Sequence, residues 1–140
     1  MVPINYLAVV VAAVVVMALG FAWYGPVFGS KWKELMGFTD ESMKAMKVTP
    51  LQATIGGLIG ALLMAYILGS AIALFVAKFP TDELVATGAL FGFWSWLGFV
   101  VPVTAGVFLW EGKPLALWVL NAGYYFVSLL AMGVILALWV

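Results

Sequence analysis

Residues 49–77, TPLQATIGGLIGALLMAYILGSAIALFVA, decide the fold of this chain. Small residues recur at every fourth position, and these residues lie nearly above one another on an α-helix. They form a shallow groove on one side of the helix, made by Ala53, Gly57, Ala61, Ala65, Gly69, Ala73 and Ala77. In lipid such a groove lets a second backbone approach closely, which predicts the central packing helix of a membrane protein. A second small-residue pair, Gly88 and Gly92, is expected to meet this groove.

The composition is that of a membrane protein. Of 140 residues, 66% are hydrophobic and 9% are charged, whereas a soluble domain has roughly 45–50% apolar and about 25% charged residues. The apolar runs are each long enough to cross a bilayer, which takes roughly 20 residues. We therefore predict one all-α transmembrane domain over residues 1–140, an integral membrane four-helix bundle. Its spans are expected at about 3–24, 50–77, 83–109 and 115–139, with one or two short interfacial helices within residues 30–47.

The residue inventory argues against several functions. The chain contains no cysteine and no histidine, which removes thiolate chemistry and the commonest metal ligand. The net charge is zero, so no overall electrostatic attraction to nucleic acid is expected. Charged residues are absent from the middle of every span, although proton relays are usually built from them. We expect no catalytic residue, no metal and no cofactor.

Local signals indicate where helices begin and end. Ser30 is expected to cap a short helix that ends at Gly37, and Thr39 is expected to cap a second one. Thr49 followed by proline is typical of the start of span two. Thr81 is placed to cap span three.

Residues 20–32 read GFAWYGPVFGSKW, and the Gly-Pro step within them is expected to end span one. The Trp-Tyr-Gly-Pro, Phe-Gly and Lys-x-Trp pattern resembles the opening signature of a bacterial family of small four-span membrane proteins. That family is known only as a domain of unknown function, so the resemblance implies fold and membrane location but no activity. The signature positions in this chain are Trp23, Tyr24, Gly25, Pro26, Phe28, Gly29, Trp32, Pro102, Trp110 and Glu111.

Uncharged polar residues gather toward one end of spans three and four. A candidate polar pocket is formed by Thr104, Asn121, Tyr124 and Tyr125. One interpretation is structural: Pro102 removes a helical hydrogen bond from the carbonyl of Gly98, and Asn121 or a tyrosine replaces it. The other interpretation is a small pocket for the head group of a ligand.

Two further features leave alternatives open. Trp94 and Trp96 point about 200° apart on a helix, so one is expected to face lipid and the other to pack inside the bundle. A ligand site lined by these rings is the less favoured alternative. Glu111 is either an exposed turn residue or the partner of a lysine in residues 30–47, which would fasten two connections together.

The lysines predict the orientation of the chain. The first and third connections hold five lysines, and the second holds only Lys78. Positively charged connections tend to be cytoplasmic, which places both termini outside the cytoplasm of a multi-pass protein in a bacterial inner membrane.

Three classes of function are compatible with this sequence. The favoured one is a non-enzymatic membrane protein that acts through helix packing or homo-oligomerisation, with membrane lipid as its other partner and no role for nucleic acid. The alternative is a transporter or channel for a small solute or a lipid-like ligand, formed by a homo-oligomer. A membrane-surface enzyme is disfavoured by the residue inventory.

Overall fold

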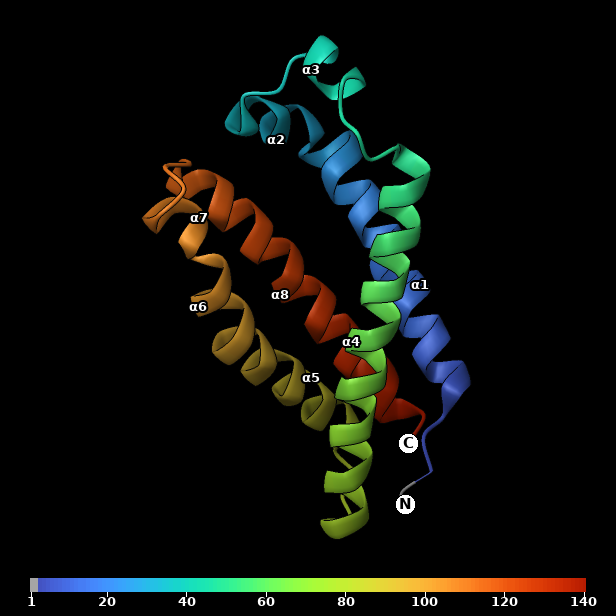
Figure 1. Cartoon of the computed structure of the whole chain (residues 1–140). Coiled ribbons are helices and arrows are strands. Elements are labelled where there is room, and N and C mark those ends of the chain that lie inside the picture. Colours follow the sequence, from blue (N-terminus) through green and yellow to red (C-terminus); the bar gives the residue numbers. More distant parts are fainter. Residues whose placement is uncertain (1–2) are drawn as a thin grey trace.

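The computed structural model describes residues 3–140, which contain helices and no strand (Figure 1). Residues 1 and 2 of the predicted domain lie outside the described residues. The helices are α1 (Tyr6–Ala22), α2 (Gly29–Met36), α3 (Asp40–Lys44), α4 (Pro50–Lys78), α5 (Leu84–Ser95), α6 (Val101–Thr104), α7 (Gly106–Leu109) and α8 (Leu115–Leu138). Two π-helical turns, Trp23–Val27 and Trp96–Val100, extend α1 and join α5 to α6.

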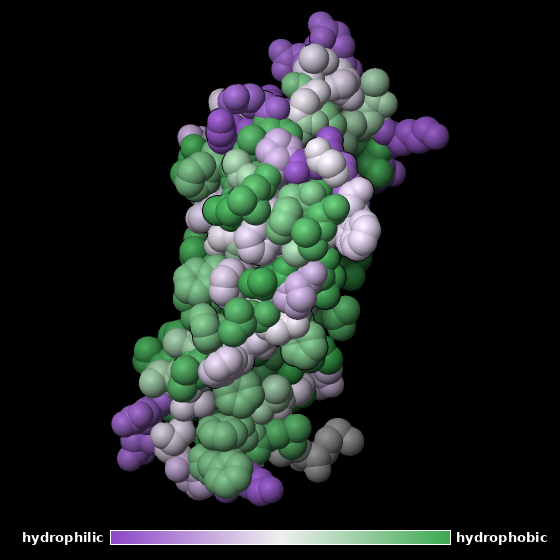
Figure 2. Space-filling view, turned by 90° about the vertical axis from the view of Figure 1, so that its left-hand side faces the viewer, coloured by the Kyte–Doolittle hydropathy of each residue, from purple (hydrophilic) through white to green (hydrophobic). Residues whose placement is uncertain are grey.

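Four helical stretches are long and apolar enough to cross a membrane: Tyr6–Val27, Pro50–Lys78, Leu84–Leu109 and Leu115–Leu138. The predicted all-α fold with four apolar spans is confirmed. Figure 2 shows hydrophilic residues at the two ends of the visible face and a broad hydrophobic zone between them. Both ends of the chain lie at the same end of the bundle as the connection between α4 and α5, opposite α2 and α3 (Figure 1).

The helix at the centre of the bundle is α8, which packs against α1, α4 and α5. The prediction that residues 49–77 form the central helix was wrong. The reason is that the small residues of α4 line only one of its sides, whereas α8 is buried on several sides. Within the predicted groove of α4 the burial is also uneven: Ala61, Ala65, Gly69 and Ala73 are buried, but Ala53, Gly57 and Ala77 are exposed.

The closest helix pair is α5 with α8. A Cβ atom added at Gly88 would lie 2.8 Å from the Cβ of Ala137 and would overlap the carbonyl of Gly133. At Gly92 it would overlap the carbonyl of Leu129. The expectation that Gly88 and Gly92 meet the groove of span two was therefore wrong, because they lie against the backbone of α8.

The groove of α4 is occupied by other helices. Gly57 lies beside the Met17 side chain of α1, with 3.5 Å between its ideal Cβ and the methionine Cε. Gly69 lies beside Leu136 of α8, with 3.1 Å to the leucine Cδ2. Since α1 and α8 cover the middle of this side of α4, α5 has little contact with it.

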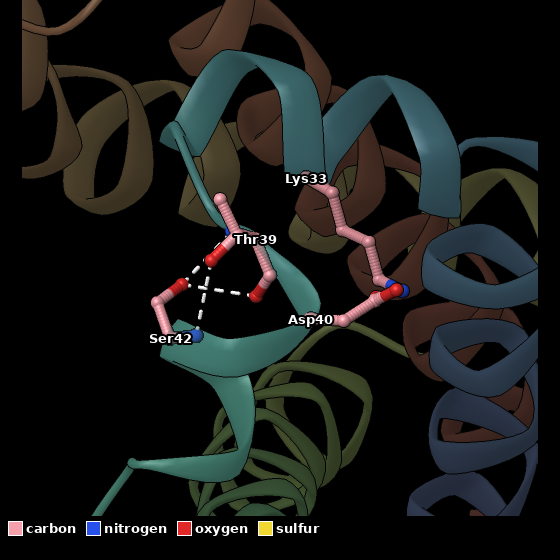
Figure 3. Close-up of polar contacts among 4 residues, drawn as sticks. All are labelled: Lys33, Thr39, Asp40 and Ser42. Atoms are coloured by element: carbon pink, nitrogen blue, oxygen red, sulfur yellow. Dashed lines mark hydrogen bonds and ion pairs between the residues drawn. The ribbon is translucent and has the colours of Figure 1, made fainter.

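Two of the predicted helix caps are confirmed. Thr39 is the N-cap of α3. Its side chain and that of Ser42 each accept a hydrogen bond from the other's backbone N–H (Figure 3). Thr49 begins α4 in the same way, together with Gln52. Gly37 ends α2 with φ of 72°, a left-handed conformation that glycine adopts without steric cost. Beside the cap of α3, Lys33 reaches Asp40 at 3.9 Å (Figure 3).

Two local predictions were wrong. Helix α2 begins at Gly29 after Phe28, so Ser30 lies inside the helix and caps nothing. Helix α5 begins at Leu84, and the Thr81 hydroxyl instead accepts a hydrogen bond from the Glu83 N–H within the preceding turn. The first span is broken at the Gly-Pro step, as predicted, because Gly25 has non-helical backbone angles (φ −108°, ψ −105°) that kink the chain.

Candidate functional site

A cavity of about 480 Å³ lies among α2, the π-helical turn that extends α1, the α6–α7 segment and α8. We call it the polar cavity. Its lining residues are Tyr24, Trp32, Thr104, Val107, Trp118, Asn121, Tyr124 and Tyr125. The structure thus brings together all of the residues of the candidate polar pocket, and it adds two aromatic residues of the sequence signature. No residue with a formal charge lines the polar cavity.

Helix α8 supplies half of this lining through its periodicity. Trp118, Asn121 and Tyr125 are separated by three and four residues, so they lie on one face of the helix. Sequence reasoning missed Trp118 and Val107. The spacing of Trp118 from Asn121 was the signal that could have identified the tryptophan, whereas nothing in the sequence distinguishes Val107 from other apolar residues.

Three hydrogen bonds fasten the first span to the last. The Tyr24 hydroxyl donates to the Asn121 Oδ1 at 2.7 Å, and the Trp23 indole Nε1 donates to the Leu120 carbonyl at 3.2 Å. The Tyr124 hydroxyl donates to the Val16 carbonyl at 3.0 Å. Because unsatisfied polar groups are costly in an apolar environment, these bonds fix how the π-helical turn sits on α8.

Glycines make room for these aromatic side chains. A Cβ atom at Gly20 would lie 2.9 Å from the Tyr124 hydroxyl oxygen, and one at Gly123 would lie 3.3 Å from the Cζ2 of Trp23. Gly29 is buried, and its Cβ would lie 2.7 Å from the carbonyl oxygen of Tyr24. A larger residue at Gly29 would move the start of α2 away from the π-helical turn, and with it Trp32.

Trp32 closes the cavity from the α2 side. Its ring lies edge-on to that of Tyr24, with 6.0 Å between the ring centroids. Tyr24 makes a similar contact with Tyr124 at 5.3 Å. Aromatic pairs in this geometry are favourable beyond their buried area, so the lining is held by ring contacts as well as by hydrogen bonds.

The structure overturns the structural interpretation of the polar residues. Asn121 binds Tyr24 and Tyr124 binds Val16, so neither serves the backbone loosened by Pro102. Groups within the α5–α6 segment itself form the hydrogen bonds around Pro102 instead. The π-helical turn lets the Val101 N–H donate to the Trp96 carbonyl. The Thr104 hydroxyl donates to the Val100 carbonyl at 2.6 Å.

Three hydrogen-bond donors of the lining have no acceptor within residues 3–140. They are the indole N–H of Trp32, the amide N–H groups of Asn121 and the hydroxyl of Tyr125. The Trp118 indole is already engaged, because it donates to the Thr104 hydroxyl oxygen at 3.0 Å. An uncharged cavity with free donors is suited to a ligand that carries acceptor oxygens and no charge.

A second, apolar depression adjoins the polar cavity. It has a volume of about 540 Å³ and lies among α4, the α5–α6 segment and α8. We call it the apolar groove. Its lining residues are Leu63, Met64, Ile67, Leu68, Ala71, Ser95, Phe99, Val100, Thr104, Tyr125 and Leu129. Thr104 and Tyr125 belong to the lining of both spaces.

Other residues singled out in the sequence lie away from the polar cavity. Pro102 is exposed, and Trp110 has an exposed fraction of 88%. Glu111 is exposed and forms no ion pair within the described part of the chain, so of the two alternatives the structure shows the exposed turn residue. The connection to α2 is made instead by Lys113, whose Nζ donates to the Met36 carbonyl at 3.4 Å.

Trp94 at the end of α5 and Trp96 at the start of the next π-helical turn lie as the helical geometry predicts. Trp94 has an exposed fraction of 62%. Trp96 donates to the Ala122 carbonyl at 2.8 Å and packs edge-on against Phe126 of α8. One ring therefore points away from the bundle and the other packs within it, as predicted.

Comparisons with known proteins identify a family. A family model described as "Protein of unknown function (DUF1761)" matches residues 7–137, which is almost the whole chain. No curated protein and no solved structure matches the chain.

Proposed function

The chain belongs to the DUF1761 family of proteins of unknown function, and we propose that it is a non-enzymatic membrane protein that binds a small ligand in the polar cavity. The observation that carries this proposal is the set of free donors on Trp32, Asn121 and Tyr125 in an uncharged lining. These donors are not fully buried, since the Ser128 Oγ is the only buried side-chain polar atom without a partner among the described residues, so they are accessible to a ligand in the cavity.

The composition of the lining favours binding over catalysis. Its polar groups are phenol, indole, amide and hydroxyl groups. No carboxylate, imidazole or amine lines the cavity, so no general base lies next to the Thr104 hydroxyl to activate it as a nucleophile. Such groups hold and orient a ligand through hydrogen bonds and ring contacts.

Native mass spectrometry of the protein purified from its membrane in mild detergent tests this proposal. We expect a bound mass on the wild-type protein that is lost in Val107→Trp, because the larger ring fills the polar cavity. The matched control is Val103→Trp, since Val103 lies one turn earlier, does not line the cavity and has an exposed fraction of 75%. A wild-type protein without bound mass, or a bound mass unchanged in Val107→Trp, would overturn the proposal.

A second candidate function is assembly into a homo-oligomer through α4. Ala53 and Gly57 belong to the predicted groove but are exposed in the single chain. Gly56 and Gly60 lie four residues apart on the same helix, and nothing lies within 4 Å of an ideal Cβ atom at either position. This surface resembles the small-residue faces through which helices associate in lipid.

Light scattering corrected for detergent tests the assembly. We expect the wild-type particle to contain more than one chain and Gly60→Ile to be a monomer, because the added side chain would block close approach. Gly98→Ile is the control, since Gly98 also has nothing within 4 Å of its ideal Cβ atom but lies on another span. A monomeric wild-type particle would contradict this function.

We also propose that the end of the bundle that carries α2 and α3 faces the cytoplasm of a bacterial inner membrane, with both termini outside. The proposal rests on the lysine distribution. Since the chain has no cysteine, single cysteines report orientation cleanly. A maleimide that cannot cross membranes should label Lys78→Cys on intact spheroplasts and should label Lys47→Cys only after permeabilisation; the reverse pattern would refute the orientation.

A further inference from the structure

We propose that the ligand is a neutral amphiphile, with a head that carries carbonyl or ester oxygens in the polar cavity and one long apolar chain in the apolar groove. This inference rests on the proposed function and specifies the chemical class of the ligand. It follows from the way in which the two spaces meet and from the groups that line each of them.

The two spaces border one another at two side chains. Thr104 and Tyr125 line both the polar cavity and the apolar groove, so a ligand whose polar and apolar parts meet beside these residues would contact both linings. The two volumes, about 480 and 540 Å³, are of similar size. A ligand that uses both therefore has a polar part and an apolar part of comparable bulk.

The lining of the polar cavity determines the chemistry of the head. Trp32, Asn121 and Tyr125 offer donors, and no lysine, aspartate or glutamate lines the cavity. Donors without a fixed charge match carbonyl and ester oxygens. A charged head would have no partner of opposite sign in the cavity, and an unpaired charge in an apolar surrounding is strongly disfavoured.

The lining of the apolar groove determines the chemistry of the tail. Leu63 and Ile67 of α4 and Phe99 of the α5–α6 segment are exposed along it. They lie on helices that are long and apolar enough to span a membrane, so in a bilayer the groove would open toward the acyl chains. A hydrocarbon chain can enter from the bilayer without passing through water, and each methylene gains apolar contact in the groove.

The test uses Val107→Cys as a reporter in the polar cavity of this cysteine-free chain. The rate of alkylation by a water-soluble maleimide is measured with three probes: 1-monooleoylglycerol, glycerol and oleoyl-lysophosphatidylcholine. We expect 1-monooleoylglycerol to slow alkylation about tenfold at ten times its dissociation constant, because only the unoccupied cavity reacts. Glycerol lacks the chain, and lysophosphatidylcholine has a zwitterionic head whose two formal charges would be unpaired in the cavity, so neither should slow the reaction at the same concentration.

A second-site variant tests whether the chain lies in the apolar groove. Ala71→Trp fills the groove from α4, so it should abolish protection of Val107→Cys by 1-monooleoylglycerol. Leu74→Trp is the control, because Leu74 is on the same helix, has an exposed fraction of 58% and does not line the groove. Tyr125→Phe should weaken protection without altering the fold, since its hydroxyl has no partner in residues 3–140, whereas Tyr6→Phe at the opposite end should have no effect.

The outcomes separate this inference from the proposed function. Protection by glycerol equal to that by 1-monooleoylglycerol, or protection that Ala71→Trp leaves unchanged, overturns the inference and leaves the proposed function standing. Equal protection by lysophosphatidylcholine overturns the requirement for a neutral head. If no probe protects although mass spectrometry finds a bound ligand, only the inference fails; without a bound mass both fail.

Discussion

Alanine at Gly92 should destabilise this protein, whereas alanine at Gly60 should not. Gly92 lies against the backbone of α8: an ideal Cβ there would be 2.7 Å from the carbonyl carbon of Leu129 and 3.0 Å from the N atom of Leu130. Carbon atoms in contact prefer about 3.5–4.0 Å, so α5 and α8 must separate by roughly 1 Å. The atoms in the way are backbone, so no side chain can rotate to avoid the new methyl group.

The size of the effect follows from two opposed terms. Overpacking a close contact costs about 1–3 kcal/mol, and the upper half of that range applies because two backbones must move. Replacing glycine by alanine in a helix gains up to about 1 kcal/mol. Gly92→Ala should therefore lower the free energy of unfolding by about 2 kcal/mol, whereas Gly60→Ala, with nothing within 4 Å of its ideal Cβ, should leave it unchanged or raise it slightly.

The measurement is reversible unfolding in mixed detergent micelles, followed by circular dichroism. A double-mutant cycle on Gly88 and Gly133 adds a sharper test, because an ideal Cβ at either glycine would overlap the other's carbonyl. Once one alanine has separated the helices, the second should cost little, so the double variant should lose less than the sum of the single losses. Equal stability of Gly92→Ala and Gly60→Ala, or strict additivity in the cycle, would refute the backbone contact.

Three further predictions concern single side chains. Tyr24→Phe removes the donor to the Asn121 Oδ1 and should lower the free energy of unfolding by about 1 kcal/mol in the same micelle assay; no change would mean that the bond is not formed in the membrane. Thr49→Ala removes the cap of α4 and should cost about 1 kcal/mol, whereas Ser30→Ala inside α2 should cost less, and equal losses would contradict the assignment of the caps. Glu111→Ala should stay within about 0.5 kcal/mol of the wild type in detergent, since this exposed residue has no ion-pair partner in the described residues; a larger loss would indicate a contact that the single chain does not form.

The number of spans and several helix ends could be predicted because both depend on local chemistry. Length and hydropathy alone place four spans, and caps such as Thr39 and Thr49 act on N–H groups two or three residues away. Thr81 shows the limit of this reasoning. Its hydroxyl binds the Glu83 N–H as a cap would, yet the helix begins only at Leu84. The same hydrogen bond occurs in turns and at helix starts, so only the backbone conformation of the residues that follow distinguishes the two.

Helix partners could not be predicted because a small-residue face does not encode which helix will cover it. The groove of residues 49–77 and the pair Gly88 and Gly92 are similar in sequence, yet the first faces α1 and α8 and the second faces α8 alone. The partner of Asn121 was missed for the same reason, since Tyr24 lies 97 residues away in sequence. The sequence did predict that polar residues group toward one end of α8. Helical periodicity alone also places Asn121 and Tyr125 on a common face.

The position of the polar cavity follows from a difference between the two ends of the bundle. At the end that carries both termini, Gly88 and Gly92 hold α5 against α8 by backbone contact. Beyond them the π-helical turn Trp96–Val100 and Pro102 redirect the chain, and α4 and the α6–α7 segment diverge toward the end that carries α2 (Figure 1). A kink in a span frees backbone groups and is tolerated where neighbouring groups satisfy them, as the Thr104 hydroxyl does for Val100. Because that same threonine lines both the polar cavity and the apolar groove, the residue that stabilises the bend also stands where the two spaces meet.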